Sequence, residues 1–150
     1  MNDSIILNKI LWGKALWKSF LALVLGFVFY MIPGLIVGFK MGFELGPKMK
    51  NSPELSFKIS KSVSLMYQEN IWLNIGFIVL IGLLIFRYAR KVSKGTGDKK
   101  YINGLIVGSF PTSIGLISVI MMGINIFFIA LILVSLSAGL LGSIVHGKST

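Results

Sequence analysis

A run of 47 residues without Asp, Glu, Lys or Arg, from Tyr101 to Gly147, constrains the fold more than any other feature of this chain. Wound as one α-helix, the run would be roughly 70 Å long, more than twice the ~30 Å hydrocarbon core of a bilayer. It must therefore turn back on itself. The segment Met122-Gly123-Ile124-Asn125 offers the turn, which predicts two membrane-spanning helices near residues 102–122 and 125–146.

Two further uncharged runs are long enough to span a membrane. Ser19 to Phe39 has 21 residues, and Asn70 to Phe86 has 17, which Arg87 extends by snorkelling. They predict spans near 19–40 and 70–88. We therefore expect an all-α polytopic membrane protein with four transmembrane helices, and a single membrane domain over residues 1–150. Because only 13% of residues are charged, against roughly 25% in soluble domains, the composition argues against a soluble enzyme and a nucleic-acid-binding domain.

The segment between the first two spans is the most distinctive polar stretch. Ser52-Pro53-Glu54 is typical of a helix start, with a capping hydroxyl, a proline and an early acid. The residues from Leu55 to Tyr67 alternate as in a strand, but they also carry an apolar stripe at helical spacing. A lone strand would lack a partner in this chain, so we favour an outward-facing amphipathic helix. The strand alternative stays open, and its free edge would pair with another protein.

Basic residues indicate how the chain is oriented. The loop 87–100 carries six in 14 positions, whereas the loop 40–69 has five lysines diluted by three glutamates. Lysines also precede the first span. By the positive-inside rule, both termini and the 87–100 loop are expected to face the cytoplasm. The loop residues should set the topology and contact anionic lipid headgroups: Arg87, Arg90, Lys91, Lys94, Lys99 and Lys100.

Small residues recur at every fourth position in three of the four predicted spans. Residues four apart lie near one helical face, where they let another backbone approach closely. One interpretation is that these faces pack the chain's own helices together. The other is that the face from Gly34 to Gly46, which begins beside Pro33 and continues until Pro47 stops the helix, docks a helix of another protein. The candidate packing residues are Gly34, Gly38, Gly42, Gly46, Gly104, Gly108, Ser135, Gly139 and Ser143.

The predicted spans carry almost no group that could do chemistry. Their one ionisable side chain with a pKa near neutrality is His146, at the end of the last span and without a partner for catalysis. The chain has no cysteine, so disulfides and thiolate metal sites are excluded. A small multidrug exporter needs a glutamate in its first span, and this chain has none there. We therefore expect no enzyme activity, no metal and no cofactor.

In size, charge and topology the whole chain resembles the plasmid-encoded inner-membrane entry-exclusion proteins of conjugative transfer systems. That resemblance implies a protein that recognises an incoming transfer protein and blocks a second plasmid transfer. It also resembles the four-span immunity proteins against pore-forming colicins, but those have a larger outer loop where this chain has Met122 to Asn125. A small transporter, a channel or a holin component is a further alternative function. A second copy of this chain, in a homo-oligomer, is a further candidate partner. Nucleic acid is not an expected partner.

Under either resemblance the partner would be recognised by residues of the outward segment. The candidates combine lysines, one acid and two aromatic side chains, and their contacts would add to those of the glycine face. They are Lys48, Lys50, Glu54, Phe57, Lys58, Lys61 and Tyr67.

Overall fold

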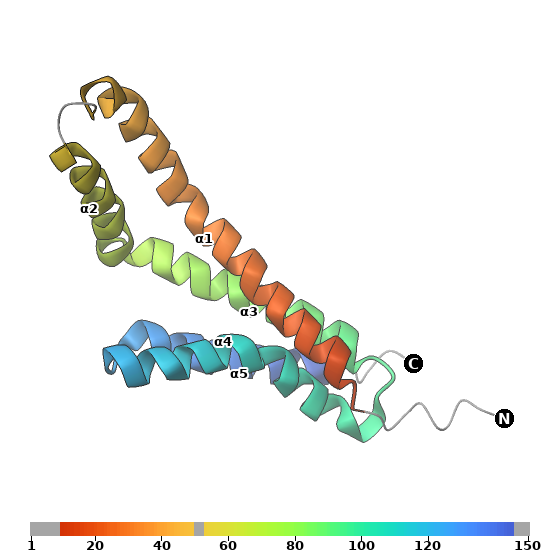
Figure 1. The fold of residues 1–150 in the computed structure, drawn as a ribbon. Coiled ribbons are helices and arrows are strands. Elements are labelled where there is room, and N and C mark those ends of the chain that lie inside the picture. The colour runs from red at the N-terminus through yellow and green to blue at the C-terminus, as the bar shows by residue number, and fades with distance from the viewer. Residues whose placement is uncertain (1–9, 50–52, 146–150) are drawn as a thin grey trace. The chain divides into compact units, whose positions relative to one another are not determined.

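The computed structural model describes residues 10–49 and 53–145, and this part of the chain contains helices and no strand. Four of its helices are long and apolar enough to cross a membrane. The prediction of an all-α polytopic membrane protein is therefore confirmed. The elements, in chain order, are α1 (Trp12–Met49), α2 (Pro53–Glu69), α3 (Ile71–Ser93), the 3-10 turn η2 (Gly97–Lys99), α4 (Lys100–Met122) and α5 (Ile126–Ile144) (Figure 1).

Helix α1 is longer than the sequence predicts at both ends. It begins at Trp12, before the charge-free run, because single lysines such as Lys14 do not interrupt a helix. The expectation that Pro47 stops it is wrong, since α1 ends at Met49. The fixed φ of a proline, near −65°, is a helical value, so Pro47 fits the helical backbone although it cannot donate a hydrogen bond to the carbonyl four residues earlier.

The outward segment is helical, so the helix prediction is confirmed and the strand alternative is excluded. Helix α2 begins at Pro53, as the helix-start signature predicts, and Glu54 lies in its first turn. Asn70 separates α2 from α3, and its side-chain oxygen accepts a hydrogen bond from the Leu73 N–H at 3.1 Å. This cap satisfies one of the free donors at the start of α3 while the chain changes direction.

Contacts between residues divide the chain into two compact units, which we call the core unit and the arm unit. The core unit comprises Met1–Gly26 and Ile78–Thr150, and the arm unit comprises Phe27–Phe77. The boundaries fall within α1 and α3, so each of these helices contributes to both units. The single domain expected over residues 1–150 stays a prediction.

In the core unit, α4 and α5 pack closely as an antiparallel pair. A Cβ atom at Gly108 would lie 2.6 Å from the Ser135 carbonyl oxygen, and one at Gly139 would lie 2.5 Å from the Gly104 carbonyl oxygen. Only residues without a side chain permit such an approach of two backbones. The turn between the helices uses Gly123 with φ +87°, and Asn125 caps α5 by accepting a hydrogen bond from the Phe127 N–H at 2.9 Å.

Helix α3 and the first turns of α1 complete the core unit. Gly142 on α5 lies against the Phe86 carbonyl and the Ala89 Cβ of α3, and Gly82 on α3 lies against Val134. On the α1 side, the Ser19 hydroxyl oxygen accepts a hydrogen bond from the Phe110 N–H at 3.0 Å. The buried Asn103 side chain accepts one from the Leu11 N–H at 2.8 Å. Buried polar side chains thus join α4 to the start of α1.

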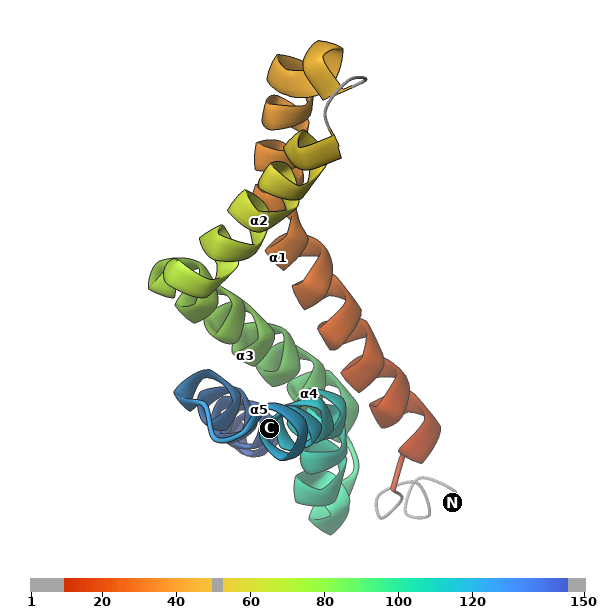
Figure 2. The same cartoon turned by 60° about the vertical axis from the view of Figure 1, so that its left-hand side comes forward.

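In the arm unit, the later part of α1 is followed by α2, which runs back toward the start of α3 (Figures 1 and 2). Helix α2 is more polar than the other helices, and its exposed side chains include Glu54, Phe57, Lys58 and Lys61. The arm unit therefore joins an apolar helix that has spanning length to a polar, surface-exposed helix.

The close α4–α5 contact predicts that Gly139→Ala destabilises the protein. The new Cβ would collide with the Gly104 backbone, which cannot move aside without displacing α4. Overpacking of this kind costs about 1–3 kcal/mol of the free energy of unfolding, which thermal unfolding of the detergent-solubilised protein measures. Gly76→Ala is the matched control, because no atom lies within 4 Å of a Cβ at Gly76. Equal stability of the two variants would contradict the packing described here.

Candidate functional site

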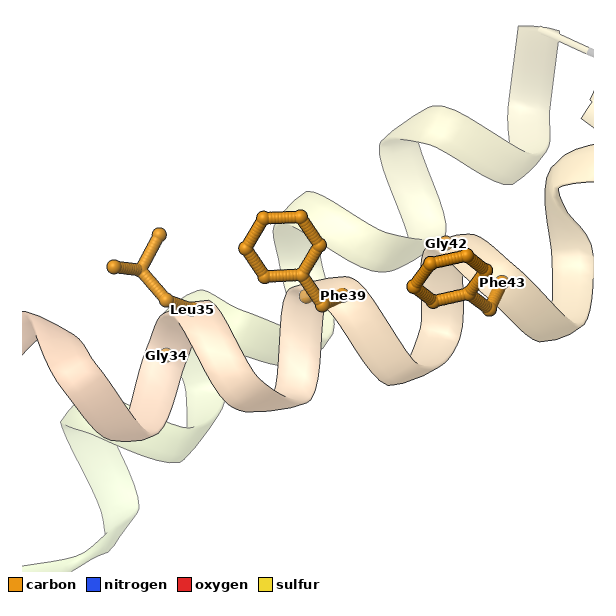
Figure 3. Close-up of a pocket in the computed structure, with 6 residues that line it drawn as sticks. Gly34, Leu35, Phe39, Gly42 and Phe43 are labelled. Atoms are coloured by element: carbon orange, nitrogen blue, oxygen red, sulfur yellow. The ribbon is translucent and has the colours of Figure 1, made fainter.

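The second half of α1 carries a hollow of about 390 Å³, lined by residues of this helix alone. Two rows border it, each with a residue at every fourth position. One row consists of glycines, and the other of large apolar side chains that project from the helix (Figure 3). The lining residues are Gly34, Leu35, Gly38, Phe39, Gly42 and Phe43. We call this surface the glycine groove.

Most of the glycine groove is uncovered in the arm unit. Cβ atoms built at Gly38 and Gly42 meet no atom within 4 Å. Phe39 and Phe43, on the opposite rim, are 66% and 82% exposed. Of Gly34, Gly38 and Gly42, therefore, only Gly34 packs against another helix of the arm unit. Gly38 and Gly42 keep their close-approach surface free.

Gly34 is buried because Tyr67 of α2 lies against it. A Cβ at Gly34 would collide with the Tyr67 hydroxyl and would lie 2.7 Å from its Cε2 atom. The hydroxyl accepts a hydrogen bond from the Gly34 N–H at 3.0 Å and donates to the Tyr30 carbonyl at 3.0 Å. Tyr67 was expected to contact a partner from the outward surface. Instead it is half-buried and joins α2 to α1.

A second polar contact lies beside the first. The Tyr30 hydroxyl donates to the Asn74 side-chain oxygen at 2.7 Å, and the Asn74 amide donates to the Tyr67 carbonyl at 3.1 Å. Around these groups the Tyr30 ring centroid lies 4.8 Å from that of Tyr67 and 4.7 Å from that of Phe77. Residues from α1, α2 and the start of α3 thus form one cluster, in which polar groups bond each other among aromatic rings.

The other candidate recognition residues have open positions on α2. Glu54, Phe57, Lys58 and Lys61 are all exposed, and Phe57 is 70% exposed. Lys50 and His146 lie outside the described residues, and so do the surroundings of Gly46 and the side chain of Lys48. The structure therefore leaves one aromatic ring, two lysines and one acid of this set free to meet a partner.

The basic residues cluster around the connection between α3 and α4. Arg87, Arg90 and Lys91 are exposed on α3 and Lys94 is exposed in the turn that follows it, whereas Lys99 in η2 and Lys100 at the start of α4 are half-exposed. The Lys100 ammonium lies 5.0 Å from the Tyr101 ring centroid. The connection itself is ordered by hydrogen bonds: the buried Thr96 hydroxyl donates to the Ser93 carbonyl at 2.9 Å, and the Ser93 hydroxyl donates to the Lys100 carbonyl at 3.0 Å.

The remaining candidate packing residues lie in the core unit. Gly104, Gly108, Ser135, Gly139 and Ser143 all lie at the α4–α5 contact, and the Ser143 hydroxyl donates to its own helix at the Leu140 carbonyl. Within the described ranges, no group of three or more His, Cys, Asp or Glu side chains could hold a metal ion. Comparisons of the chain with protein-family models, curated proteins and solved structures found no match.

Sequence reasoning overlooked the pairing of Tyr30, Tyr67 and Asn74. A signal was present, because an asparagine at position 74 in an otherwise apolar helix must find a hydrogen-bond partner within the membrane. Tyr30 and Asn74 lie 44 residues apart in the chain, and spacing within one helix does not reveal a contact between them.

The cluster predicts that Asn74→Leu destabilises the arm unit. Leucine has a similar volume, but it leaves the Tyr30 hydroxyl and the Tyr67 carbonyl without these partners. We expect the free energy of unfolding in detergent to fall by about 0.6–2 kcal/mol. Gln68→Leu is the control, because it removes an exposed amide at the position next to Tyr67 on α2. If both variants unfold like the unmodified protein, the cluster does not stabilise the fold.

Proposed function

We propose that this chain is a non-enzymatic protein of a bacterial inner membrane that blocks entry by recognising an incoming partner, and that its role is entry exclusion in plasmid conjugation. The observation that carries the proposal is the glycine groove. It is a close-approach surface on a helix long enough to span a membrane, and Gly38 and Gly42 on it remain uncovered in the arm unit.

The groove has the properties that a docking helix requires. From Gly34 to Gly42 it extends about 12 Å along α1, a little more than two helical turns. Its glycines let a second backbone approach closely, and Phe39 and Phe43 flank the approach with large apolar surfaces. Contacts between helices in lipid contribute only about 0.6–2 kcal/mol each, so a continuous groove supports recognition better than isolated residues would.

Two other surfaces support the proposal. Phe57, Lys58 and Lys61 on α2 offer exposed apolar and basic contacts to the soluble part of a partner. The basic cluster between α3 and α4 suits anionic lipid headgroups on the cytoplasmic side, where such charges hold the orientation of the spans. In this proposal the arm unit faces outward and both termini face the cytoplasm.

The decisive experiment expresses the gene in a plasmid-free recipient. Conjugative uptake of related and unrelated plasmids is measured together with survival of pore-forming colicins. We expect uptake of a related plasmid to fall while uptake of unrelated plasmids and colicin killing stay unchanged. Selective survival of one colicin would replace exclusion by immunity. Growth arrest with membrane depolarisation would favour a holin or a channel, and no change in any assay would contradict the whole class.

The groove itself is tested by Gly38→Leu. Because a Cβ at position 38 meets no atom within 4 Å, we expect normal abundance in the membrane. The added side chain blocks the approach of a partner helix, so exclusion should weaken by about tenfold or more, the effect of losing ~1.4 kcal/mol of binding free energy. Gly13→Leu is the control on the same helix, since its surroundings are equally open. Full exclusion by an abundant Gly38→Leu protein would remove the groove from the mechanism.

The proposed orientation is tested by reporter fusions. A fluorescent protein inserted at Gly95, or fused after Thr150, should be fluorescent, and alkaline phosphatase inserted at residues 50–52 should be active. The first two sites belong to the segments expected in the cytoplasm, and the third belongs to the outward segment. Phosphatase activity from an insertion at Gly95 would reverse the orientation.

A further inference from the structure

Helix α1 contains a weak point at Pro33, in the middle of the apolar part of the helix. Proline has no N–H, so the carbonyl of Phe29 loses its usual helical donor, and the ring crowds the same carbonyl. Helix α1 nevertheless continues through this position without a break. Such a site is a natural place for a helix to bend unless neighbouring groups hold it.

The group that lies at this weak point is the Tyr67 hydroxyl of α2. It accepts a hydrogen bond from the Gly34 N–H at 3.0 Å and donates to the carbonyls of Tyr30 at 3.0 Å and Met31 at 3.2 Å. In a regular helix the Gly34 N–H and the Tyr30 carbonyl are each other's partners. One side chain thus contacts both members of the backbone pair that spans Pro33.

The contact has a second anchor close to the break between α2 and α3. The Asn74 side chain bridges the Tyr30 hydroxyl of α1 and the Tyr67 carbonyl of α2. Asn70 is the one residue between the end of α2 and the start of α3. Tyr67 therefore joins α1 to α2 near two interruptions of regular helix, at Pro33 and at Asn70.

We propose that Tyr67 is a releasable latch that holds α2 on α1 and covers the first glycine of the groove. When the latch is closed, the Tyr67 ring and hydroxyl occupy the space beside Gly34, while Gly38 and Gly42 are open. When it opens, α2 moves away from α1, and the open face extends to three glycines. A docking helix that uses all three must displace Tyr67.

The latch and its use in docking are tested separately. The latch concerns only contacts within the arm unit, and it holds or fails in the isolated protein. Its use, to control how much of the groove a partner can reach, rests on the function proposed above. The experiment therefore measures the movement of α2 without any partner, and exclusion in cells is measured separately.

The absence of cysteine from the chain permits a direct measurement. Phe43→Cys on α1 and Phe57→Cys on α2 place two spin labels at sites that are 82% and 70% exposed. Double electron–electron resonance in lipid nanodiscs then gives the distribution of distances between the helices. We expect one narrow distribution with Tyr67 present. Tyr67→Phe, which keeps the ring and removes the hydroxyl, should broaden it and add longer distances. Tyr101→Phe, which removes an exposed hydroxyl elsewhere, should leave it unchanged.

A second variant opens the latch from the α1 side. In Gly34→Ala the new methyl group takes the place of the Tyr67 hydroxyl, so the same broadening is expected, whereas Gly38→Ala enters open space and should have no effect. If the labelled Tyr67→Phe protein is monodisperse and helical, its distance distribution decides the question. If it is not, the distance distribution of Gly34→Ala decides it. A distribution unchanged by the deciding variant overturns the latch. Broadening supports it, whatever the exclusion assay shows.

The amide of Gly34 gives an independent readout. In the latched state it donates to Tyr67, and loss of this bond in Tyr67→Phe should speed its hydrogen exchange by about fivefold, which corresponds to ~1 kcal/mol. The Gly38 amide, one turn further along α1, serves as the internal control. Equal exchange of the Gly34 amide with and without the Tyr67 hydroxyl would contradict the role given to this bond.

Discussion

The structure depends on one constraint: in a bilayer, a backbone polar group must find its hydrogen-bond partner within the protein. Helices satisfy most of the backbone, but the proline in α4 and the one in the middle of α1 each remove a donor. At both places a hydroxyl from another helix contacts the adjacent backbone. Ser19 accepts from the N–H of Phe110, next to Pro111, and Tyr67 accepts from the N–H of Gly34, next to Pro33. These contacts tie helices together at the weak points of their backbones.

Glycines at the same spacing serve opposite purposes in the two units. In the core unit, Gly104, Gly108 and Gly139 bring the backbones of α4 and α5 together, and no space remains for a side chain. In the arm unit, Gly38 and Gly42 form the same kind of surface, but no atom lies within 4 Å of a Cβ built at either position. A helix face with this pattern lowers the cost of a close approach, but it does not specify which helix approaches.

This difference explains how much could be read from the sequence. Charge-free runs predicted four spans, because the thickness of the bilayer fixes the length of a spanning helix. The signature at Pro53 predicted α2, because capping and early acidic residues act within one turn. Helix ends were predicted less well: α1 includes Trp12 and continues past Pro47, since a lone lysine or a proline near an end does not stop a helix.

Only part of the candidate site could be predicted from the sequence. The glycine spacing in α1 marks a close-approach surface, but whether that surface is covered depends on contacts with distant residues. The sequence predicts Tyr67 as an outward aromatic residue, because nothing within α2 indicates that its hydroxyl reaches the backbone beside Pro33. Likewise, the sequence places Asn74 in an apolar run, but it does not identify Tyr30, 44 residues away, as its partner.

The position of Tyr67 connects the stability of the arm unit with its capacity to bind. A surface of glycines on a spanning helix would associate with any small-residue helix in the membrane if it were fully open, and such association has little selectivity. Covering Gly34 with a side chain adds a cost that only a partner with sufficient contacts elsewhere can offset, for example at Phe57 or Lys61 of α2. Under the proposed function, the contact that stabilises the free arm unit would therefore also set a threshold for docking. In this proposal, selectivity arises from the combination of a partly covered groove and an exposed helix, rather than from either surface alone.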